Sequence, residues 1–311
     1  MDSSPLLSII LPLFNKADVL PDVVAALARQ TLAKESEVIF LDDVSTDGSV
    51  ETLRALADKL PRCHIVTNEK NAGPAIRLNQ GAAEAAGQYL CLIDADVLIA
   101  GDAPEQMIAI LRRTGAQMIH GRTQALTDAA ARNVAAMIGP NPKMALSDTP
   151  LETVLAGGMA RMGWVVETTL YRAGGGCDER IFIQDESVAL RLAASARRLV
   201  KLDAAVATAP KAAFHQSGNR RQEHHDAFFA HFNLLHDRPD LTERHRRLIG
   251  KRCLSFAWKA VRTDGLKDGA AIFSAYLTAA LGLGQATPRL LDRIAEDMAS
   301  LPGVRRPESA P

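Results

Sequence analysis

The sequence predicts an α/β protein: a mainly parallel, mixed sheet flanked by helices, followed by a helical C-terminal extension. Two observations carry this prediction. In residues 1–100, short apolar runs alternate with helix-like stretches, which is typical of βαβ units. Residues 223–300 show helical periodicity with almost no strand signal. A chain of 311 residues, 47% of them hydrophobic, is long enough to bury a large core around such a sheet.

The individual elements follow from apolar spacing and from the polar or glycine-bearing segments between them. Strands are expected at Leu7–Pro12, Glu37–Leu41, His64–Thr67, Gln88–Ile93 and Gln117–His120. Helices are expected over Val19–Gln30, after Asp47-Gly48-Ser49 with Ser49 or Asp47 as the cap, over Ala75–Ala86 and Pro104–Arg113, and from about Asp185. The change in pattern divides the chain into residues 1–222, a helical extension over 223–303, and a disordered tail over 304–311.

The charge balance excludes nucleic acid as the main partner. The 36 basic and 36 acidic residues cancel, but residues 1–105 carry 8 basic and 16 acidic side chains, and residues 106–311 carry the other 28 and 20. Nucleic-acid binders gain most of their affinity from clustered Lys and Arg, so a front half with a net charge of −8 argues against that class. An acidic half suits a metal site instead.

The cysteines and the N-terminus indicate a cytoplasmic protein. The four cysteines are far apart and form no CxxC pair, so we interpret them as reduced thiols. The first residues contain an apolar run without a basic region before it or a small-residue cleavage site after it, which does not match a signal peptide. Contact with the inner face of the membrane stays open because Gly269–Pro288 has no charged residue. In that segment Ile272, Phe273, Tyr276, Leu277 and Leu281 recur at helical spacing and predict one apolar face, which packs on the protein or lies on a membrane surface.

Three acidic clusters stand at positions where a ligand would bind. Asp42-Asp43 and Asp94-Ala95-Asp96 each follow an apolar strand directly, and ligands of open α/β sheets bind at the carboxyl ends of strands. Carboxylates there can accept hydrogen bonds from a base or from ribose hydroxyls, and the D-x-D pair offers hard oxygen ligands for Mg²⁺ or Mn²⁺. Gln184-Asp185-Glu186 is typical of the first turn of a helix, where the helix dipole stabilises acids. Solvated turns and helix caps are the structural alternative for each cluster.

Taken in order, the motifs resemble those of family-two glycosyltransferases of the GT-A fold, a Rossmann-like fold of nucleotide-diphospho-sugar transferases. The resemblance covers about residues 6–217. The motifs are Leu7–Lys16 with the turn P-x-[YF]-N, Gln30-Thr31, Asp42–Ser49 as D-D-x-S-T-D-x-S, Asn71-Ala72-Gly73, Asn79-Gln80-Gly81, Ala86–Tyr89, Asp94-Ala95-Asp96 and Gly175–Glu179. The resemblance implies a nucleotide-binding half over 1–100 and an acceptor half over 101–222.

The resemblance also implies a role for each site residue. Asp96 would hold a divalent cation, Mn²⁺ or Mg²⁺, on the diphosphate, with His215 near the metal or the diphosphate. Asp185 would be the general base that deprotonates the acceptor hydroxyl, with Glu186 as its substitute. The remaining positions would bind the nucleotide sugar, and these are Pro12, Phe14, Asn15, Asp42, Asp43, Ser45, Asn71, Gly73, Asn79 and Asp94.

The resemblance implies an inverting, metal-dependent transferase that moves a sugar from a UDP- or GDP-linked donor to an acceptor hydroxyl. The product would be a cell-surface polysaccharide, a lipopolysaccharide or a glycolipid, and the acceptor a glycan or a lipid-linked glycan. Gln184 stands where the family often has Glu, and Cys177 where an aromatic residue is usual. These departures favour the alternative, a catalytically silent member that binds nucleotide or serves as a scaffold in a glycan-assembly complex.

The basic C-terminal half holds most of the histidines. His224 and His225, between Glu223 and Asp226, predict a solvated helix face. The basic segments Arg220-Arg221 and Arg244-His245-Arg246-Arg247 predict the same, with anionic lipid at a membrane surface as the other candidate. A nucleotidyltransferase would need a glycine-rich phosphate loop after the first strand, and Leu11–Lys16 contains no glycine.

Overall fold

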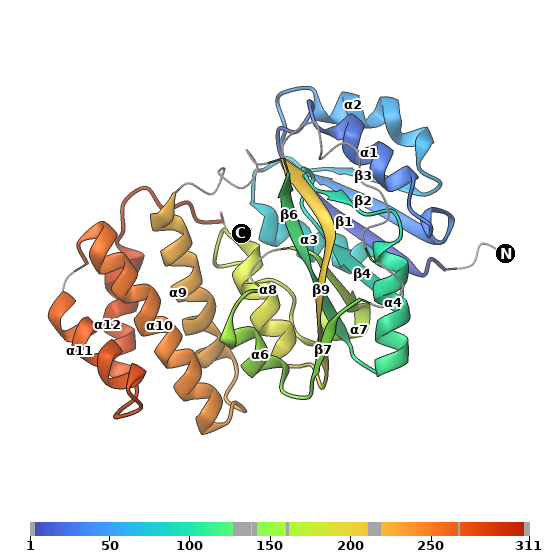
Figure 1. Cartoon of the computed structure of the whole chain (residues 1–311). Coiled ribbons are helices and arrows are strands. Elements are labelled where there is room, and N and C mark those ends of the chain that lie inside the picture. The colour runs from blue at the N-terminus through green and yellow to red at the C-terminus, as the bar shows by residue number, and fades with distance from the viewer. Residues whose placement is uncertain are drawn as a thin grey trace.

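A computed structural model of the chain describes residues 4–126, 138, 142–159, 162–210, 219–266 and 268–307. It confirms the predicted class: a curled mixed sheet carries helices on both faces, and further helices follow at the C-terminal end (Figure 1). His215 lies outside the described residues.

The sheet places four parallel strands side by side at the start of the chain. Within the described residues its order is β3-β2-β1-β4-β8-β6-β9-β5, with β7 added on β9. Strands β1 to β4 pair in parallel, whereas β8 is antiparallel to both β4 and β6. The strands are β1 Leu7–Leu13, β2 Ser36–Asp42, β3 Cys63–Thr67, β4 Tyr89–Leu92, β5 Leu98–Ile99, β6 Met118–Leu126, β7 Met144–Ser147, β8 Trp164–Glu167 and β9 Leu199–Pro210.

The helices of this unit are α1 Leu20–Ala28, α2 Ser49–Leu56, α3 Pro74–Glu84, α4 Ala103–Thr114, α6 Pro150–Ala156, α7 Thr168–Ala173 and α8 Gln184–Ala193, with short 3₁₀ turns at Ala33–Glu35 and Ala57–Lys59. The cap of α2 differs from the prediction. Gly48, in a left-handed conformation with φ 86°, is the N-cap, and Asp47 accepts the backbone N–H of Ser49 at 3.0 Å from just outside the helix. A glycine suits this position because other residues rarely adopt positive φ.

Alternation along β1 builds a core on each face of the sheet. Successive side chains of a strand point to opposite faces. Ile9 and Leu11 pack with α1 and α4 on one face, whereas Ile10, which lies between them in the strand, packs with α3 on the other face. The second face also receives α7, α8 and the C-terminal helices, so one continuous core joins the sheet to the extension.

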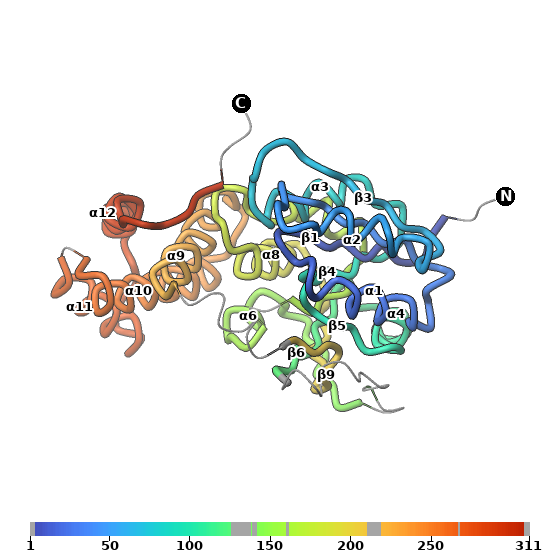
Figure 2. Tube along the Cα trace, turned by 90° about the horizontal axis from the view of Figure 1, so that it is seen from above, coloured from blue at the N-terminus to red at the C-terminus, as the bar shows by residue number. Residues whose placement is uncertain are grey.

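The extension consists of α9 Arg220–Asp237, α10 Glu243–Asp264, α11 Gly269–Ala280 and α12 Pro288–Ala299. Helix α9 starts at Arg220, within the predicted unit 1–222, and packs on α8, which lies between α9 and the sheet (Figure 2). Arg305, in the predicted tail, is held to α9: its N–H donates to Gln222 Oε1 at 2.7 Å, and its carbonyl accepts from Gln222 Nε2 at 3.0 Å.

Helix α11 divides its apolar side chains between the core and the surface. Ile272 is fully buried, but Phe273, Leu277 and Leu281 are 42%, 45% and 64% exposed. The predicted apolar stripe of α11 thus packs on the protein at Ile272 and is exposed at Phe273, Leu277 and Leu281. Across the described part of the chain, the helices lack the combination of length and hydrophobicity that crossing a membrane requires.

Candidate functional site

The predicted donor-site residues gather where β1, β2 and β4 end. The turn after β1 and the loop after β2 hold each other through two hydrogen bonds: the N–H of Asn15 donates to Ser45 Oγ at 2.9 Å, and the N–H of Thr46 donates to Asn15 Oδ1 at 2.8 Å. Asn15 has a positive φ of 51°, a conformation that asparagine tolerates better than most residues. Phe14 is 45% exposed beside this turn, and Pro12 is half-buried.

The carboxylates of Asp42 and Asp43 are buried and accept hydrogen bonds from backbone N–H groups of nearby loops. Asp42 accepts the N–H groups of Val44 and Ser45 at 3.2 Å each. Asp43 accepts the N–H groups of Ala72 and Gly73 at 2.9 and 2.8 Å. At 3% and 4% exposure, these side chains order the loops that surround the strand ends.

Arg77 completes the surroundings of Asp43, a role that the sequence did not reveal. Its Nε donates to Asp43 Oδ1 at 2.7 Å, and both side chains are buried. The side chain of Asn71 donates to the Asp43 carbonyl at 2.8 Å. Gly73 is left-handed with φ 89°, and a Cβ there would lie 3.2 Å from the ring of Phe182. The predicted residues Asp43, Asn71 and Gly73 thus form one network, in which the side-chain contacts are internal.

Asn79 is also fully engaged within the protein. Its Oδ1 accepts from the Tyr171 hydroxyl at 2.8 Å and from the Cys177 N–H at 2.9 Å, while its Nδ2 donates to the Cys177 carbonyl and to Glu179 Oε1. A side-chain amide has two donors and two acceptor positions, so these bonds occupy all of them. Asn79 fastens α3 to the loop before α8 instead of offering its amide to a ligand.

The D-x-D segment meets groups from two distant parts of the chain. Asp96 Oδ2 lies 2.6 Å from Lys16 Nζ, which comes from the turn after β1. Asp94 Oδ1 accepts from Gln184 Nε2 at 2.9 Å, and Gln184 is the first residue of α8. The structure therefore brings the D-x-D segment next to the first turn of α8, which also carries the predicted base Asp185. Lys16 was not identified from the sequence.

The donor atoms of this segment fit a divalent cation that is shared with a diphosphate. Mg²⁺ is usually bound by one or two carboxylates together with substrate phosphates and water, and Asp94 and Asp96 supply that number. Among the described residues, which do not include His215, no group of three or more His, Cys, Asp or Glu side chains is arranged to hold a metal alone.

Helix α9 positions the start of α8. The backbone N–H groups of Phe182 and Ile183, just before α8, donate to Asp226 Oδ2 at 3.1 and 2.7 Å. His225 Nδ1 lies 2.6 Å from the other oxygen of Asp226, and the two side chains are 4% and 0% exposed. The prediction of a solvated face for His225 was therefore wrong. Asp226 holds the turn that leads into Asp185, whose own side chain is half-buried.

The cysteines agree with the prediction of separate thiols. All four are free, and burial raises the pKa of Cys63 to about 11 and of Cys91 and Cys177 to about 12. A thiol with so high a pKa carries little thiolate near neutral pH, so none of these three is a nucleophile.

Comparison with known proteins places the chain in a family. Residues 8–162 match the model of the family Glycosyl transferase family 2. The chain is 33% identical over 117 residues to an uncharacterized glycosyltransferase of Haemophilus influenzae, covering 38% of this chain and 46% of that protein. It is 35% identical over 92 residues to the putative teichuronic acid biosynthesis glycosyltransferase TuaG of Bacillus subtilis, covering 30% of this chain and 36% of that protein. These matches span less than half the length of either relative.

Solved structures share the fold. S. aureus TarS 1–349 in complex with UDP-GlcNAc has a TM-score of 0.66 at 19% identity, covering 93% of this chain and 83% of that one. The mannosyltransferase PcManGT of Pyrobaculum calidifontis, in complex with GDP-Man and Mn²⁺, has a TM-score of 0.57 at 17% identity, covering 96% and 85%. The likeness extends over nearly the whole described chain, including the helical extension.

Proposed function

Because the chain belongs to glycosyl transferase family 2, we propose that it is an inverting glycosyltransferase using a UDP- or GDP-linked sugar. The acceptor is a hydroxyl of a cell-surface polysaccharide, lipopolysaccharide or glycolipid. In support of a polysaccharide, the relative TuaG is named as a putative glycosyltransferase of teichuronic acid biosynthesis. The observation that carries the proposal is the hydrogen bond between Gln184 and Asp94, which joins the base-bearing helix to the D-x-D segment.

On the donor side, Asp96 and Asp94 face the place where a diphosphate would lie. A divalent cation held there would neutralise the charge that develops on the leaving nucleoside diphosphate. Lys16, 2.6 Å from Asp96, adds a positive charge of the protein's own at the same point. The exposed Phe14 and the half-buried Pro12 border the nucleotide base. The ordered backbone around Ser45, Asn71 and Gly73 shapes the wall of that site.

On the acceptor side, Asp185 accepts the proton of the acceptor hydroxyl. The hydroxyl oxygen attacks the anomeric carbon, the bond from that carbon to the phosphate oxygen breaks, and the electron pair leaves with the nucleoside diphosphate. A single displacement of this kind inverts the configuration at the anomeric carbon. Asp185 sits at the first turn of α8, where the dipole favours the carboxylate that a general base requires.

The decisive test is hydrolysis or transfer of UDP- and GDP-sugars by the full chain with Mn²⁺ or Mg²⁺. Loss of a general base or of a preorganised electrostatic contact costs roughly 10²- to 10⁴-fold in rate, so we expect Asp185→Asn and Asp96→Ala to lose at least that much. Asp18→Ala, an exposed acid in the turn before α1, is the matched control. Full activity in both folded variants would refute the assignment.

The same assay separates the enzyme from a silent scaffold. A scaffold that retains the nucleotide site would bind UDP or GDP in calorimetry and release no sugar from any donor. Gln184 and Cys177 are the residues that favour this alternative, since they depart from the family pattern. A screen of nucleotide sugars would fix the base and the sugar together if turnover is seen.

We also propose that α11 touches an anionic membrane surface from the cytoplasmic side. Phe273, Leu277, Leu281 and the following Leu283 are exposed, and Lys251 of α10 lines a cavity together with Tyr276 of α11. Apolar side chains beside a basic one suit the interface of an anionic bilayer. Vesicles of phosphatidylglycerol should bind the wild type more tightly than the double variant Leu281→Glu/Leu283→Glu. Leu146→Glu, on the exposed strand β7, is the control, and equal binding of all three proteins would contradict the proposal.

A further inference from the structure

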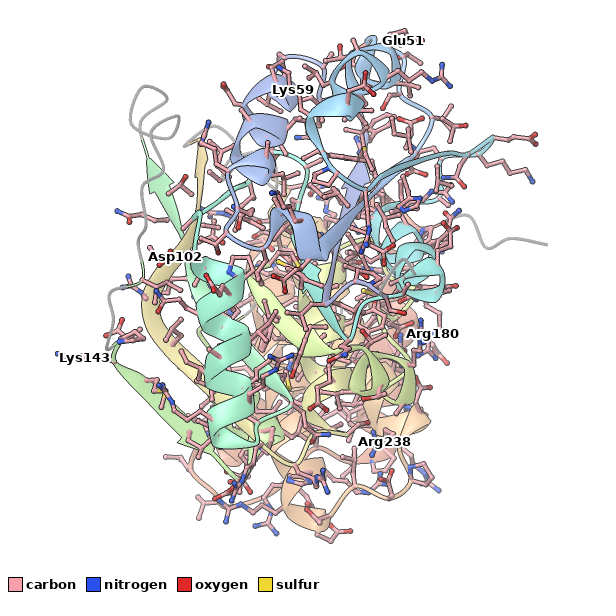
Figure 3. The ribbon with its side chains drawn as sticks, turned by 90° about the vertical axis from the view of Figure 1, so that its right-hand side faces the viewer. Glu51, Lys59, Asp102, Lys143, Arg180 and Arg238 are labelled. Carbon is pink, nitrogen blue, oxygen red and sulfur yellow. The ribbon has the colours of Figure 1, made fainter. Side chains whose placement is uncertain are left out.

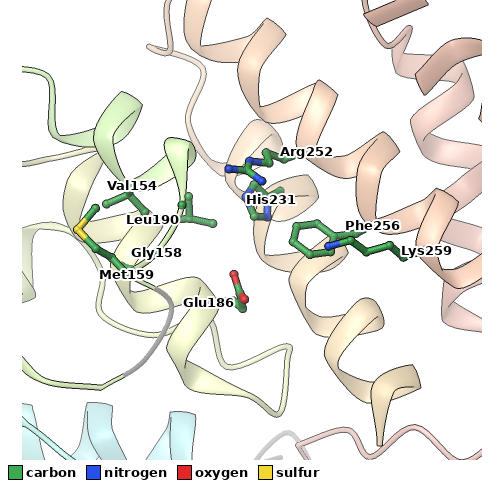
Figure 4. A pocket seen from close by; sticks show the side chains of 11 residues that line it. Val154, Gly158, Met159, Glu186, Leu190, His231, Arg252, Phe256 and Lys259 are labelled. Carbon is green, nitrogen blue, oxygen red and sulfur yellow. The ribbon is translucent and has the colours of Figure 1, made fainter. Parts of the chain in front are cut away.

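A cavity lies at the first turn of α8, the turn that carries the candidate base. It has a volume of about 260 Å³ and is formed where α6, α8, α9 and α10 meet (Figure 4). Glu186, directly after the candidate base Asp185, lines this cavity. The volume is just below the roughly 300–1,000 Å³ that pockets for drug-sized ligands span. A small group fits there, and no role proposed above uses the cavity.

One face of α10 supplies an aromatic ring between two cations. Arg252, Phe256 and Lys259 follow each other at i, i+4 and i+7, so they lie on one side of the helix and all line the cavity. Lys259 Nζ lies 4.6 Å from the centre of the Phe256 ring. Arg252 Nε donates to the Leu155 carbonyl at 2.7 Å, and Nη2 binds the same oxygen. A guanidinium has five N–H donors, so Arg252 is held in place with donors left for a ligand.

The facing groups accept hydrogen bonds. His231, which is 4% exposed, bonds the Ala227 carbonyl through Nδ1 at 2.7 Å. A carbonyl only accepts, so Nδ1 carries the proton; burial lowers the pKa of His231 to about 4, and Nε2 of the neutral ring is an acceptor. Glu186 lies opposite Arg252 and His231 on α8 (Figure 4). The cavity thus combines two cations, two acceptors and an aromatic ring.

We propose that this cavity anchors a non-reacting part of the acceptor through an anionic group, a phosphate or a carboxylate, held by Arg252 and Lys259. The ring of Phe256 and the acceptors Glu186 and His231 receive the polyol or sugar that carries the anion. The role as an acceptor subsite rests on the proposed transferase function, since only then is the neighbouring Asp185 a base. Placing the anchor one residue from the base would orient the acceptor hydroxyl before attack.

The wall at Gly157 makes the cavity sensitive to a small change. Gly157, with φ 99°, ends α6, and a Cβ added there would lie 3.2 Å from Arg252 Nη2. Gly157→Ala therefore both strains the backbone and pushes against the guanidinium. We expect it to weaken binding of the anion while leaving the charge of the cavity unchanged.

The experiment is a calorimetric titration of the full chain with inorganic phosphate, glucuronate and glucose. We expect phosphate or glucuronate to bind and glucose to bind at least about tenfold more weakly, since charge-assisted bonds are the strong ones. The tighter of the two anions identifies the source. Lys259→Gln should weaken anion binding about fivefold, which is the size of an exposed charge contact. Arg247→Gln, which also removes one positive charge at an exposed position of α10, should have no effect.

Three results would overturn the proposal. The first is no binding of either anion, and the second is equal anion binding by Lys259→Gln and Arg247→Gln. The third is loss of anion binding in Lys16→Gln while Lys259→Gln and Gly157→Ala bind as the wild type does, which would place the anion at the strand ends. Titration of the wild type with UDP and GDP is the separate test of the donor site. Anion binding at Lys259 without nucleotide binding would refute the proposed function and leave an anion site, whereas nucleotide binding without it would refute the anchor alone.

Discussion

The proposed donor side and the proposed acceptor side of the site use their acidic residues in opposite ways. At the ends of β2 and β4, Asp43 and Asp96 are paired with Arg77 and Lys16 at 2.7 and 2.6 Å. On α8, Glu186 is half-buried among other charges, and its pKa is raised to about 7. Burial is the largest cause; Arg252 and Lys259 lower the value, and Glu223 and Asp226 raise it. The donor side is thus fixed by satisfied carboxylates, while the acceptor side keeps a carboxyl that is costly to ionise.

This difference indicates where each side tolerates change. A carboxylate with a full set of partners supports the fold around it, so its removal leaves buried donors without a partner. A carboxyl with a raised pKa opposes the fold when it is ionised, so its removal relieves a cost. Retaining such a group at the cavity beside the base suggests that it serves binding instead of stability.

The largest expected effect is on the donor side. Asp43→Ala removes the partner of the buried Arg77 and the acceptor of two backbone N–H groups. Breaking a buried pair in this way costs about 3–5 kcal/mol of the free energy of unfolding. Urea unfolding followed by circular dichroism measures the loss, with Asp18→Ala as the exposed control. A loss below about 1 kcal/mol would show that the network does not support the donor loops.

The acceptor side predicts a gain that depends on pH. Glu186→Gln cannot ionise, whereas wild-type Glu186 ionises near pH 4.5 when unfolded and near pH 7 when folded. Between these values the unfolded state releases the proton first, so the free energy of unfolding of the wild type falls as the pH rises. We expect the variant to gain about 2–3 kcal/mol over the wild type between about pH 4 and pH 8. Glu69→Gln, an exposed loop residue, should show no such trend in urea unfolding.

A smaller effect tests the link between α9 and α8. Asp226→Asn keeps one side-chain oxygen but removes the negative charge of the carboxylate. That carboxylate accepts the backbone N–H groups of Phe182 and Ile183 and lies beside His225. We expect a loss of about 1–2 kcal/mol and faster amide hydrogen exchange at Phe182 and Ile183. Asp292→Asn, 56% exposed on α12, is the control. Unchanged hydrogen exchange at both amides would mean that the turn before α8 stays ordered without the Asp226 carboxylate.

The smallest effect is at the loop contact between β1 and β2. Ser45→Ala removes the acceptor of the Asn15 N–H, an exposed bond of 2.9 Å. Such a bond contributes about 0.5–1.5 kcal/mol, reduced here because water can replace the hydroxyl. Thermal unfolding should detect a small shift, with Thr149→Ala, an exposed residue before α6, for comparison. If Ser45→Ala lowered the free energy of unfolding as much as Asp43→Ala does, buried and exposed loop contacts would not differ in their contribution to stability.

The sequence was sufficient for the early strands and for the acids that end them. Apolar runs that stop at Asp42 and Asp94 locate β2 and β4, because a strand buried on both faces has a continuous apolar sequence. β9 was missed, since Lys201 and Asp203 interrupt its apolar start and mostly small residues follow, so the run Leu199–Pro210 resembles a loop. Its partners β6 and β7 come from distant segments, and pairing at such separation leaves no local signal.

The side-chain contacts across the site could not be predicted from sequence patterns. Lys16 and Arg77 look like ordinary basic residues in the sequence, and only the fold shows that they meet Asp96 and Asp43. Arg180 and Arg238, far apart in the chain, lie on one side of the molecule, where Arg180 pairs with Asp237 (Figure 3). Asp226 sits among charged residues that suggest a wet surface. Its burial comes from the turn at Phe182 and Ile183, which no spacing within α9 encodes.

The hydrogen bonds from the turn before α8 to Asp226 limit where chimaeras and truncations of such proteins can be cut. The family match ends at residue 162, yet the group that sets the candidate base lies in α9. A chimaera that exchanges the helical extension between relatives would exchange this group too, and a truncation at 222 would remove it. Residues 182–183 and 222–226 therefore form one hydrogen-bonded unit that crosses the apparent domain border. Acceptor specificity and the setting of the base are expected to change together when one half is replaced.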